Sequence, residues 1–497
     1  MSTTQERIDR AVQDGVGPLR AILECQRDAF VAEGPPSAAV RRNRIDRLLA
    51  LVLDNAHEFV DAMDADFGTR PKAGSLFTEV LGMISVIEHT RAHVPQWMRA
   101  TKLMRAARLA GLKAEVQPSP LGVVGIIGPW NYPLQLVVLP ASAAFAAGNR
   151  VMVKMSEITP RTAELVKSTA PKYFDPTELD IVTGGPEVSA TFSSLPFDHL
   201  FFTGSPGVGA LVQQAAAKNL VPVTLELGGK NPVVVSPDAD IKRSAIRIAQ
   251  ARMINGGQVC VCPDYVFVPH DRIDTFVDIA RETLRGMFPS IVGNDDYCSS
   301  VNHANFDRVV GLIDDARANG ATVETVAPPG ESLPDRATRK IAPTIVRDVD
   351  ETMRIANEEV FGPVLVVRPY SELTSVIDHI NARPSPLVAY WYGPDNDDFG
   401  RFVRHTRSGG VARNDFGAQM IPSAAPFGGV GRSGMGAYHG KAGFDAFSHY
   451  RTVVGTDLPF SITGRAAPPF SGSTKAGIGI ALRMARARTR RRLKRRR

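Results

Sequence analysis

LGVVGIIG at residues 121–128 opens the stretch of sequence that decides the fold. Four more short apolar runs follow it, namely RVMVK (150–154), ELDIV (178–182), HLFF (199–202) and PVTLE (222–226). Segments with a helical pattern lie between these runs, among them one from about Pro206 to Asn219. Short apolar runs that alternate with helices are typical of a parallel sheet covered by helices. The stretch 121–226 therefore predicts an α/β domain.

The same alternation continues on the C-terminal side. Residues 232–400 contain the apolar runs VVVS, YVFVP, APTIV and PVLVV, which predict a second α/β domain. On the N-terminal side, residues 40–53 place Val40, Ile45, Leu48, Leu49 and Val52 near one face at helical spacing, with arginines opposite. We therefore expect the first hundred residues to begin with amphipathic helices.

The composition excludes several classes of protein. The chain has 497 residues, of which 44% are hydrophobic and 22% charged, so neither a disordered chain nor a disulfide-stapled miniprotein fits. Its four cysteines are too few and too scattered for a disulfide framework, which favours a reducing compartment. The N-terminal MSTTQERIDR lacks the apolar core of a signal peptide, and no apolar stretch reaches the ~20 residues of a membrane span. We expect a cytoplasmic protein.

The charge is divided unevenly along the chain. The formal net charge is +7, but residues 458–497 carry twelve Lys or Arg and no Asp or Glu, so the rest of the chain has −5. A basic tail is an accessory and not evidence that the whole chain binds nucleic acid. We expect residues 459–497 to be disordered and to contact an anionic membrane surface or a nucleic acid weakly, which would place the protein peripherally at a membrane.

The segment Asn255-Gly256-Gly257-Gln258-Val259-Cys260 is a glycine-rich approach to a cysteine. Glycines allow a substrate to approach the backbone, and a thiolate is a strong nucleophile, although a lone cysteine is more often a buried small hydrophobe. Cys262 follows two residues later, but Cys-x-Cys without a second Cys/His pair cannot complete a zinc shell, so we expect no metal site.

Two further segments suggest chemistry at the ends of strands. Glu226 ends an apolar run and is followed by two glycines, so it is either a base that faces a cleft or a solvated loop residue. In Phe202-Thr203-Gly204-Ser205-Pro206, Ser205 is a candidate N-cap and Pro206 the first helical residue. The free amides of such a helix start suit a pyrophosphate, although the glycine spacing is not that of the usual dinucleotide fingerprint.

Seven motifs stand in a diagnostic order. They are Pro129-Trp130-Asn131-Tyr132-Pro133, Lys154-Met155-Ser156-Glu157, the Phe-Thr-Gly-Ser turn at 202–205, Glu226-Leu227-Gly228-Gly229, Gly257-Gln258-Val259-Cys260, Glu358-Glu359-Val360-Phe361-Gly362-Pro363 and Pro426-Phe427-Gly428-Gly429. In order and spacing they resemble the aldehyde dehydrogenase superfamily over residues 40–455. Pro263-Asp264-Tyr265 and GAYHGK at 436–441 are similar to its class 3 and coniferyl aldehyde dehydrogenase branch.

The resemblance implies a catalytic role for three residues. Cys260 would attack an aldehyde to form a thiohemiacetal, whose oxyanion the Asn131 amide and the Cys260 backbone amide would hold. Hydride transfer to the nicotinamide would leave a thioester, and Glu226 would activate the water that hydrolyses it. The substrate would be an apolar aldehyde, aromatic or of medium to long aliphatic chain.

The resemblance also implies a cofactor site for NAD, with NADP as an alternative. Lys154 and Glu157 would contact the adenosine ribose, where Glu157 would repel a 2′-phosphate. The remaining cofactor contacts would come from the pyrophosphate turn and the nicotinamide end, namely Gly204, Ser205, Gly209, Glu359, Phe361 and Trp130. Met155, where the family usually has proline, and Val259, where threonine is common, are departures that would alter the ribose pocket and the cleft beside Cys260.

The implied fold class is α/β, with a Rossmann-like cofactor-binding domain, an α/β catalytic domain and a small β oligomerisation arm. The cofactor-binding domain would comprise residues 1–102 and 120–226, the catalytic domain 227–434, and the arm 103–119 and 449–458. Because the arm resembles an element exchanged between subunits, we expect a homodimer.

Three alternatives remain at this stage. A dehydrogenase that transfers the acyl group to coenzyme A is disfavoured by Glu226, which such enzymes can dispense with. A non-catalytic relative is disfavoured by the joint presence of Asn131, Glu226 and Cys260. A protein that is primarily a membrane or nucleic-acid binder is disfavoured because the basic charge is confined to the tail.

Overall fold

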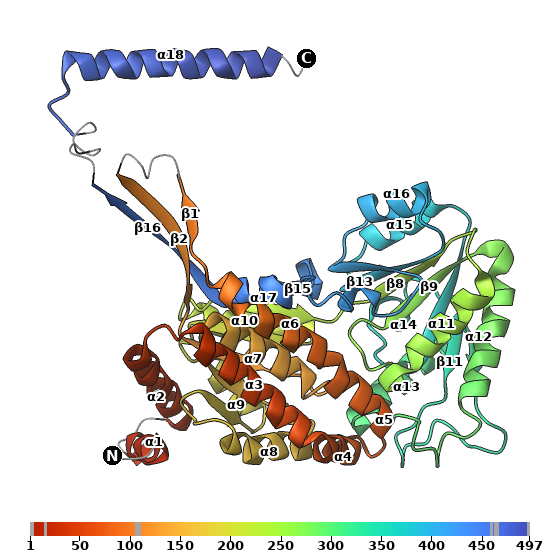
Figure 1. Cartoon of the computed structure of the whole chain (residues 1–497). Coiled ribbons are helices and arrows are strands. Elements are labelled where there is room, and N and C mark those ends of the chain that lie inside the picture. Colours follow the sequence, from red (N-terminus) through yellow and green to blue (C-terminus); the bar gives the residue numbers. More distant parts are fainter. Residues whose placement is uncertain (1–3, 14–16, 105–110, 458–460, 462–466, 495–497) are drawn as a thin grey trace. The chain divides into compact units, whose positions relative to one another are not determined.

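The computed structural model describes residues 4–13, 17–104, 111–457, 461 and 467–494 (Figure 1). Parts of the predicted segments, namely 1–3, 14–16, 105–110, 458–460, 462–466 and 495–497, lie outside the described residues. Residues 1–98 and 118–449 form one compact unit, and residues 99–117 and 450–497 form a second.

The first unit contains a six-stranded sheet in the order β15-β7-β6-β3-β4-β5. Its strands are β3 (Val123–Ile127), β4 (Arg150–Lys154), β5 (Leu179–Val182), β6 (His199–Gly204), β7 (Val223–Leu227) and β15 (Gly434–Met435). Strands β3 to β7 are parallel, whereas β15 runs antiparallel to β7 and places Gly434 opposite Glu226. The five parallel strands correspond to the five apolar runs from which the sheet was predicted.

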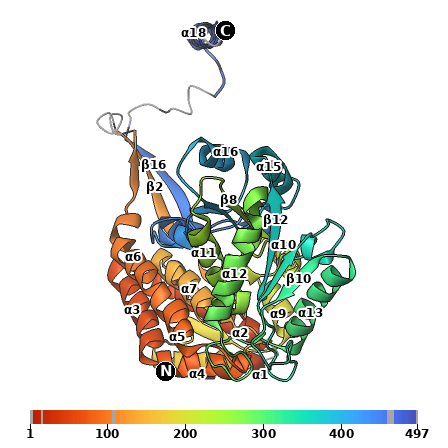
Figure 2. The same cartoon turned by 90° about the vertical axis from the view of Figure 1, so that its right-hand side faces the viewer.

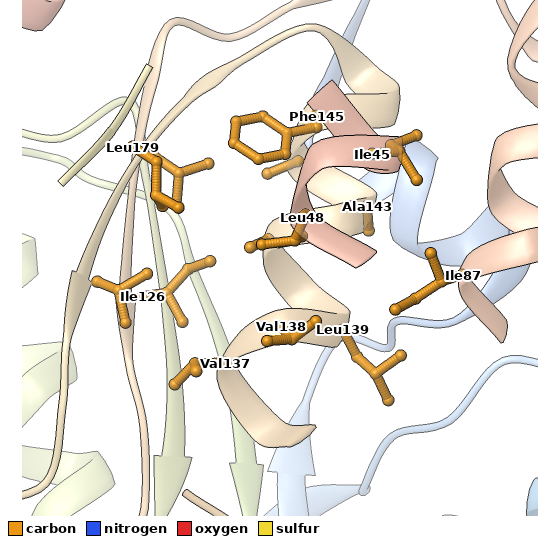
Figure 3. Close-up of a cluster of buried hydrophobic side chains, with 14 of the residues drawn as sticks. Ile45, Leu48, Ile87, Ile126, Val137, Val138, Leu139, Ala143, Phe145 and Leu179 are labelled. Atoms are coloured by element: carbon orange, nitrogen blue, oxygen red, sulfur yellow. The ribbon is translucent and has the colours of Figure 1, made fainter. Parts of the chain in front are cut away.

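Helices cover both faces of this sheet. Ile126 and Leu179 on one face pack against Val137 and Val138 of α7 (Gln135–Ala147), whose outer side packs against α3 and α6 (Figure 3). Because α7 is apolar on all sides, it can be buried as a middle layer. The helices around this sheet are α1 (Thr4–Gln13), α2 (Pro18–Glu33), α3 (Ala38–Asp54), α4 (Ala56–Phe67), α5 (Lys72–Ser75), η1 (Leu76–Leu81), α6 (Gly82–Trp97), α8 (Pro160–Thr169), η3 (Ala170–Lys172), α9 (Pro186–Ser193), α10 (Pro206–Ala217) and α17 (Gly440–Ala446).

A seven-stranded sheet in the order β10-β11-β12-β9-β8-β13-β14 forms the other half of this unit. Its strands are β8 (Asn231–Val235), β9 (Pro263–Pro269), β10 (Thr322–Thr325), β11 (Thr344–Arg347), β12 (Val364–Tyr370), β13 (Val388–Tyr392) and β14 (Gly410–Arg413). All neighbouring pairs are parallel except β10 with β11. Side chains alternate along the strands, so that Val233 and Val235 belong to one core cluster and Val234 to another.

This second sheet is also covered on both faces. Helices α11 (Ile241–Met253) and α12 (Ile273–Met287) lie side by side over one face (Figures 1 and 2). The other face packs against α13 (His303–Ala318), α15 (Leu373–Asn381) and α16 (Asp397–His405). The remaining helical segments are η4 (Ile254–Gly257), η5 (His270–Arg272), α14 (Arg354–Asn357), η6 (Ala418–Met420) and η7 (Gly431–Ser433). Parallel sheets buried on both faces confirm the predicted α/β fold class.

The predicted helix over residues 40–53 is present as α3, but two of its arginines are buried and not solvated as expected. Arg41 is 3% exposed and donates hydrogen bonds to the carbonyl oxygens of Ala146 and Ala147 at the end of α7. A guanidinium can satisfy the free carbonyls of a helix end, so its burial is compensated by hydrogen bonds. The sequence pattern alone did not distinguish these arginines from surface charges.

The second unit contains a three-stranded sheet in the order β1-β2-β16, formed by β1 (Thr101–Leu103), β2 (Leu112–Pro120) and β16 (Ser448–Thr456). It also contains α18 (Gly472–Lys494), which has no buried residue. The prediction that the tail is disordered was therefore wrong for these residues. Residues 472–494 include four alanines and six arginines, which favour helix, whereas the prediction considered only the charge of the tail. Within the described ranges, no helix is both long and apolar enough to span a membrane.

Glu178 connects α3 to the edge of the first sheet and supplies a test of the fold. It accepts hydrogen bonds from Arg44 at 2.9 Å and from Arg47 at 2.7 and 2.9 Å. Burial opposes ionisation, but the hydrogen bonds and charges of Arg47 and Arg44 lower the pKa of Glu178 to about 2. The stabilisation is therefore complete above the ordinary pKa of 4.5 and is lost as the pH falls toward 2.

We expect Glu178→Gln to lower the free energy of unfolding by about 2–3 kcal/mol at neutral pH, since buried Arg44 then keeps only Glu33 of its two carboxylate partners and Arg47 loses its ion pair. Thermal unfolding followed by circular dichroism at pH 7 and pH 3 measures this loss, which should be smaller at the lower pH. Glu164→Gln, an exposed position on α8, is the control. Equal melting temperatures for wild type and Glu178→Gln at pH 7 would contradict the assignment.

Candidate active site

A cavity of about 1430 Å³ lies in the first unit at the carboxyl ends of the strands of the six-stranded sheet. This is the place where parallel α/β sheets bind ligands. Nine of the eleven site residues predicted from the sequence line this cavity, namely Trp130, Asn131, Glu157, Gly204, Ser205, Glu226, Cys260, Glu359 and Phe361. Lys154 and Gly209 do not line it.

The loop before Cys260 has an unusual backbone. Asn255, Gly256 and Gly257 have φ angles of 49°, 63° and 77°, so three consecutive residues are left-handed. This conformation is strained for residues with a Cβ and explains the two glycines. A Cβ on Gly257 would also overlap the carbonyl oxygen of Gly362 and lie 2.6 Å from its carbon. The loop that leads to Cys260 therefore packs directly against the backbone of the 358–362 loop.

Side chains on both sides of the loop fix Cys260. The Gln258 amide donates to the carbonyl oxygens of Asn255 and Ser299, both at 3.0 Å. Asn231, at the start of β8, donates to the carbonyl oxygens of Cys260 at 2.7 Å and Cys262 at 3.0 Å. The cysteine is thus held between two sets of hydrogen bonds that leave its thiol at the cavity wall.

Asn131 is tied to the same loop. Its Nδ2 donates to the Gln258 carbonyl oxygen at 3.2 Å, and its own carbonyl oxygen accepts from Asn255 Nδ2 at 3.3 Å. A side-chain amide has two N–H donors, so the second can point at a substrate oxygen. The residue is 4% exposed and lies on the cavity wall, so its orientation is set before any ligand binds.

Glu226 lies at the end of β7 and is 4% exposed, so the solvated-loop interpretation of this residue is wrong. Within the described part of the chain, neither of its carboxylate oxygens has a hydrogen-bond partner. Burial raises the pKa of Glu226 well above its ordinary value of 4.5. A buried carboxyl without donors resists ionisation, and a carboxyl of this kind is found where proton transfer takes place.

The Cys260 thiol is also held neutral. Burial, and then the charges of Glu359 and Glu226, raise the pKa of Cys260 to about 12, although the amides of Cys260 and Val261 act in the opposite direction. Burial and the charge of Asp264 likewise raise the pKa of Glu359 to about 8. The two glutamates therefore oppose the ionisation of the thiol inside one cavity.

The opposite end of the cavity has the features of a dinucleotide site. As predicted, Ser205 is the N-cap of α10, accepting from the Val208 amide at 3.4 Å, and Pro206 is the first helical residue. Glu157 lines the cavity, and its carboxylate lies 3.6 Å from Nζ of Lys154, which is buried beneath it. Gly209 has a packing role, because a Cβ there would lie 2.7 Å from the Leu227 side chain.

Several residues that position Glu359 were missed by the sequence reasoning. Asp264 forms an ion pair with Lys230 and accepts from the Val360 amide at 2.9 Å. Arg308 donates to the carbonyl oxygens of Glu359 at 3.1 Å and Val360 at 2.7 Å.

Glycine makes room for the Glu359 carboxylate on the other side. A Cβ on Gly228 would overlap that carboxylate.

The sequence contained a signal for the missed residues, because Asp264 is a charged residue inside an otherwise apolar strand.

Cys262 points away from the cavity. It is 3% exposed, and its Sγ donates to the carbonyl oxygens of Ala251 at 3.6 Å and Arg252 at 3.9 Å. Burial raises the pKa of Cys262 to about 11. These contacts support the interpretation of this cysteine as a small residue that fills the core behind the loop that leads to Cys260.

Comparison with known proteins agrees with this arrangement. The model of the aldehyde dehydrogenase family matches residues 3–453, and the chain belongs to this family. It is similar to the coniferyl aldehyde dehydrogenase of Pseudomonas sp. (strain HR199 / DSM 7063), with 43% identity over 88% of this chain and 91% of the relative. It is also similar to aldehyde dehydrogenase family 3 member A2 of Macaca fascicularis, with 36% identity over 91% of each chain. The predicted class 3 and coniferyl branch is confirmed.

A solved structure gives the same result for the fold. The substrate-bound state of the Staphylococcus aureus AldH superposes with a TM-score of 0.86 at 33% identity, covering 94% of this chain and all of the other. The protein is thus an aldehyde dehydrogenase that uses NAD(P). The residues at the cavity fit this cofactor, because the start of α10 offers free amides to phosphates and Gly228 leaves space beside Glu359.

The close packing of Gly257 on Gly362 supplies a test of the site. We expect Gly257→Ala to lower kcat/KM for aldehyde oxidation by ~10²-fold or more, because the added methyl group displaces the loop that leads to Cys260. Steady-state kinetics and the melting temperature should be measured together. Gly286→Ala on α12, where a Cβ meets no atom within 4 Å, is the matched control and should keep its activity. Wild-type kinetics in Gly257→Ala would show that the contact is dispensable.

Proposed function

We propose that this protein oxidises an apolar aldehyde to the carboxylic acid through a covalent intermediate on Cys260. One observation carries the proposal. Asn131, Glu226 and Cys260 come from three segments that are far apart in the sequence, yet their side chains line one cavity. That cavity also reaches the start of α10, where a phosphate can bind.

Each residue would have a separate task. Cys260 attacks the aldehyde carbon after losing its proton, and the resulting thiohemiacetal oxyanion accepts hydrogen bonds from the Asn131 amide and the Cys260 backbone amide. NAD(P)⁺, when bound, accepts the hydride that leaves this carbon. The thioester that remains on Cys260 is hydrolysed by a water molecule whose proton Glu226 accepts. Cys260 then leaves as the thiolate, and the acid is released.

The walls of the cavity support an apolar substrate, either aromatic or of medium to long aliphatic chain. Away from the cofactor end they are built mainly of hydrophobic side chains, among them Phe77, Leu81, Leu136, Leu139, Met253, Phe416, Met420, Ile421 and Phe427. Phe77, Leu81 and Ile421 are exposed, which makes the rim of this cavity apolar as well. Binding of an apolar substrate is favoured because it removes both the substrate and these walls from water.

Glu157 supports a preference for NAD, with NADP as a weaker cofactor. Its carboxylate lines the cavity with 38% of its side chain exposed, and Lys154 below it is largely inaccessible. A carboxylate at the adenosine ribose accepts hydrogen bonds from a free 2′-hydroxyl and repels a 2′-phosphate.

The proposed mechanism is tested by Glu226→Gln, which keeps the size of the side chain and removes the proton acceptor. Thioester formation should survive better than its hydrolysis. We expect a burst of about one equivalent of reduced nicotinamide per active site, followed by a steady rate that is ~10²–10⁴-fold lower than in the wild type. Stopped-flow absorbance of the reduced cofactor measures both phases.

The cysteines provide the matched controls. Cys260→Ser should lose the burst and nearly all turnover, whereas Cys262→Ser should keep most of both. The reverse behaviour of the two variants would show that the nucleophile is misassigned. Normal steady turnover in Glu226→Gln would show that another group activates water, and a large acceleration by coenzyme A would favour acyl transfer over hydrolysis.

The three-stranded sheet supports the proposal of a homodimer. Strand β16 is an edge of this sheet and exposes Val453 and Val454. Edge strands with apolar side chains tend to pair with another chain. We assign the predicted arm, residues 103–119 and 449–458, to this contact as far as the structure describes it.

Helix α18 supports peripheral binding of a cytoplasmic protein to an anionic membrane. It carries eight Lys or Arg and no acidic residue, mostly in its C-terminal half. Its N-terminal half exposes four apolar side chains, Ile478, Ile480, Leu482 and Met484. Basic residues beside exposed apolar residues favour a lipid surface over a nucleic acid, to which the apolar part would contribute nothing.

Deleting residues 465–497 should leave aldehyde turnover intact and reduce cosedimentation with vesicles that contain an anionic phospholipid. The binding should weaken as salt is added, because exposed charges are screened. Vesicles of neutral lipid are the control for charge. Unchanged sedimentation after the deletion would contradict a role of the tail, and loss of DNA binding without loss of vesicle binding would favour a nucleic acid.

A further inference from the structure

Glu226 shares its side of the six-stranded sheet with two hydroxyl groups, those of Thr203 and Tyr438. Thr203 of β6 is the register partner of Glu226 in β7, so both side chains lie on the same face. Within the described part of the chain, the Thr203 hydroxyl also has no hydrogen-bond partner. Tyr438 lines the same cavity and belongs to the core cluster on this face of the sheet.

The backbone brings Tyr438 to this position. Strand β15 pairs Gly434 with Glu226 and Met435 with Leu225, and the chain then passes Thr224, close to which Gly436 leaves space. Tyr438 exchanges two backbone hydrogen bonds of 2.8 Å with Phe427.

The ring of Tyr438 is fixed by its aromatic neighbours. Its centroid lies 5.1 Å from that of Phe201 and 5.7 Å from that of Phe427, both in edge-on contact. The ring is therefore held rigidly, while its hydroxyl makes no hydrogen bond with any described residue.

The electrostatics connect this hydroxyl with the reacting groups. Burial, followed by the charges of Glu226 and Cys260, raises the pKa of Tyr438 well above its ordinary value, so the phenol keeps its proton. For Glu226, in contrast, the raised pKa hinders its proposed role. As a base it must be ionised, yet burial opposes this and it has no hydrogen-bond donor within the described residues. A phenol that keeps its proton is the kind of donor that stabilises a carboxylate.

We propose that Tyr438 is a positioning residue whose hydroxyl donates a hydrogen bond to one water, which in turn donates a hydrogen bond to the carboxylate of Glu226. The hydrogen bond holds Glu226 in its ionised form and oriented for the hydrolysis of the thioester. No proton is lost by Tyr438 in this step, since the proton from the hydrolytic water goes to Glu226. The inference rests on the proposed function, in which Glu226 is the base.

The test is Tyr438→Phe, which keeps the ring between Phe201 and Phe427 and removes only the hydroxyl. A hydrogen bond to a charged group is worth about one to two pKa units. We therefore expect the rising limb of kcat against pH to move upward by about one pH unit. Turnover below this limb should fall ~10-fold and recover at high pH, while the burst of reduced cofactor stays near one equivalent.

A matched control separates this effect from the loss of a buried phenol. Tyr370 donates to the Val235 carbonyl oxygen at 2.7 Å, outside the cavity, so Tyr370→Phe should leave the pH profile in place. Adding Tyr438→Phe to Glu226→Gln should change kcat less than twofold, because the partner of the hydroxyl is then already absent.

Two results would overturn the inference. One is an unshifted pH limb in Tyr438→Phe, and the other is a full ~10-fold loss when the substitution is added to Glu226→Gln. Both leave the proposed function intact if the wild type oxidises aldehydes and Glu226→Gln shows its burst. Absence of aldehyde oxidation in the wild type would refute the proposed function and the inference with it.

Discussion

The active site depends on one close approach of two backbones. Gly257 in the loop that leads to Cys260 meets the carbonyl group of Gly362, and the Arg252 guanidinium donates to the same carbonyl and to that of Pro263 at 2.7 Å. This contact joins the segment that carries Cys260 to the segment that carries Glu359 and Phe361. The left-handed backbone at residues 255–257 is the local cost of the approach, and the hydrogen bonds of Gln258 and Arg252 offset it.

Each of the two sheets supplies different residues of the site around this contact. The six-stranded sheet supplies Glu226 and the start of α10 from the carboxyl ends of adjacent parallel strands. The seven-stranded sheet supplies the frame of Cys260 through Asn231 and that of Glu359 through Asp264, which begin or lie in its strands. Each sheet is buried on both faces, so the groups at its strand ends are rigid before a ligand arrives.

The sequence predicted those parts of the molecule that depend on local pattern. Apolar runs of the length of a buried strand gave the parallel sheet, and the Ser205-Pro206 pair gave the start of α10. Contacts between distant segments were not predictable in the same way. Nothing local to Arg41 shows that it meets the end of α7, and nothing local to Tyr438 shows that it lines the same cavity as Glu226. The tail helix was missed because propensity and charge repulsion act in opposite directions there.

Three acidic groups line the cavity, and their proximity constrains the order in which they can ionise. Cys260, Glu226 and Glu359 are all more difficult to ionise than in water, and the charges of both glutamates act on the thiol. Ionising either glutamate therefore makes the thiol harder to ionise. In the proposed mechanism the negative charge is first on the sulfur, for attack, and later on Glu226, for hydrolysis. Hydrogen-bond donors that are already in place, such as the Asn131 amide and the amides of Cys260 and Val261, then decide where that single charge resides.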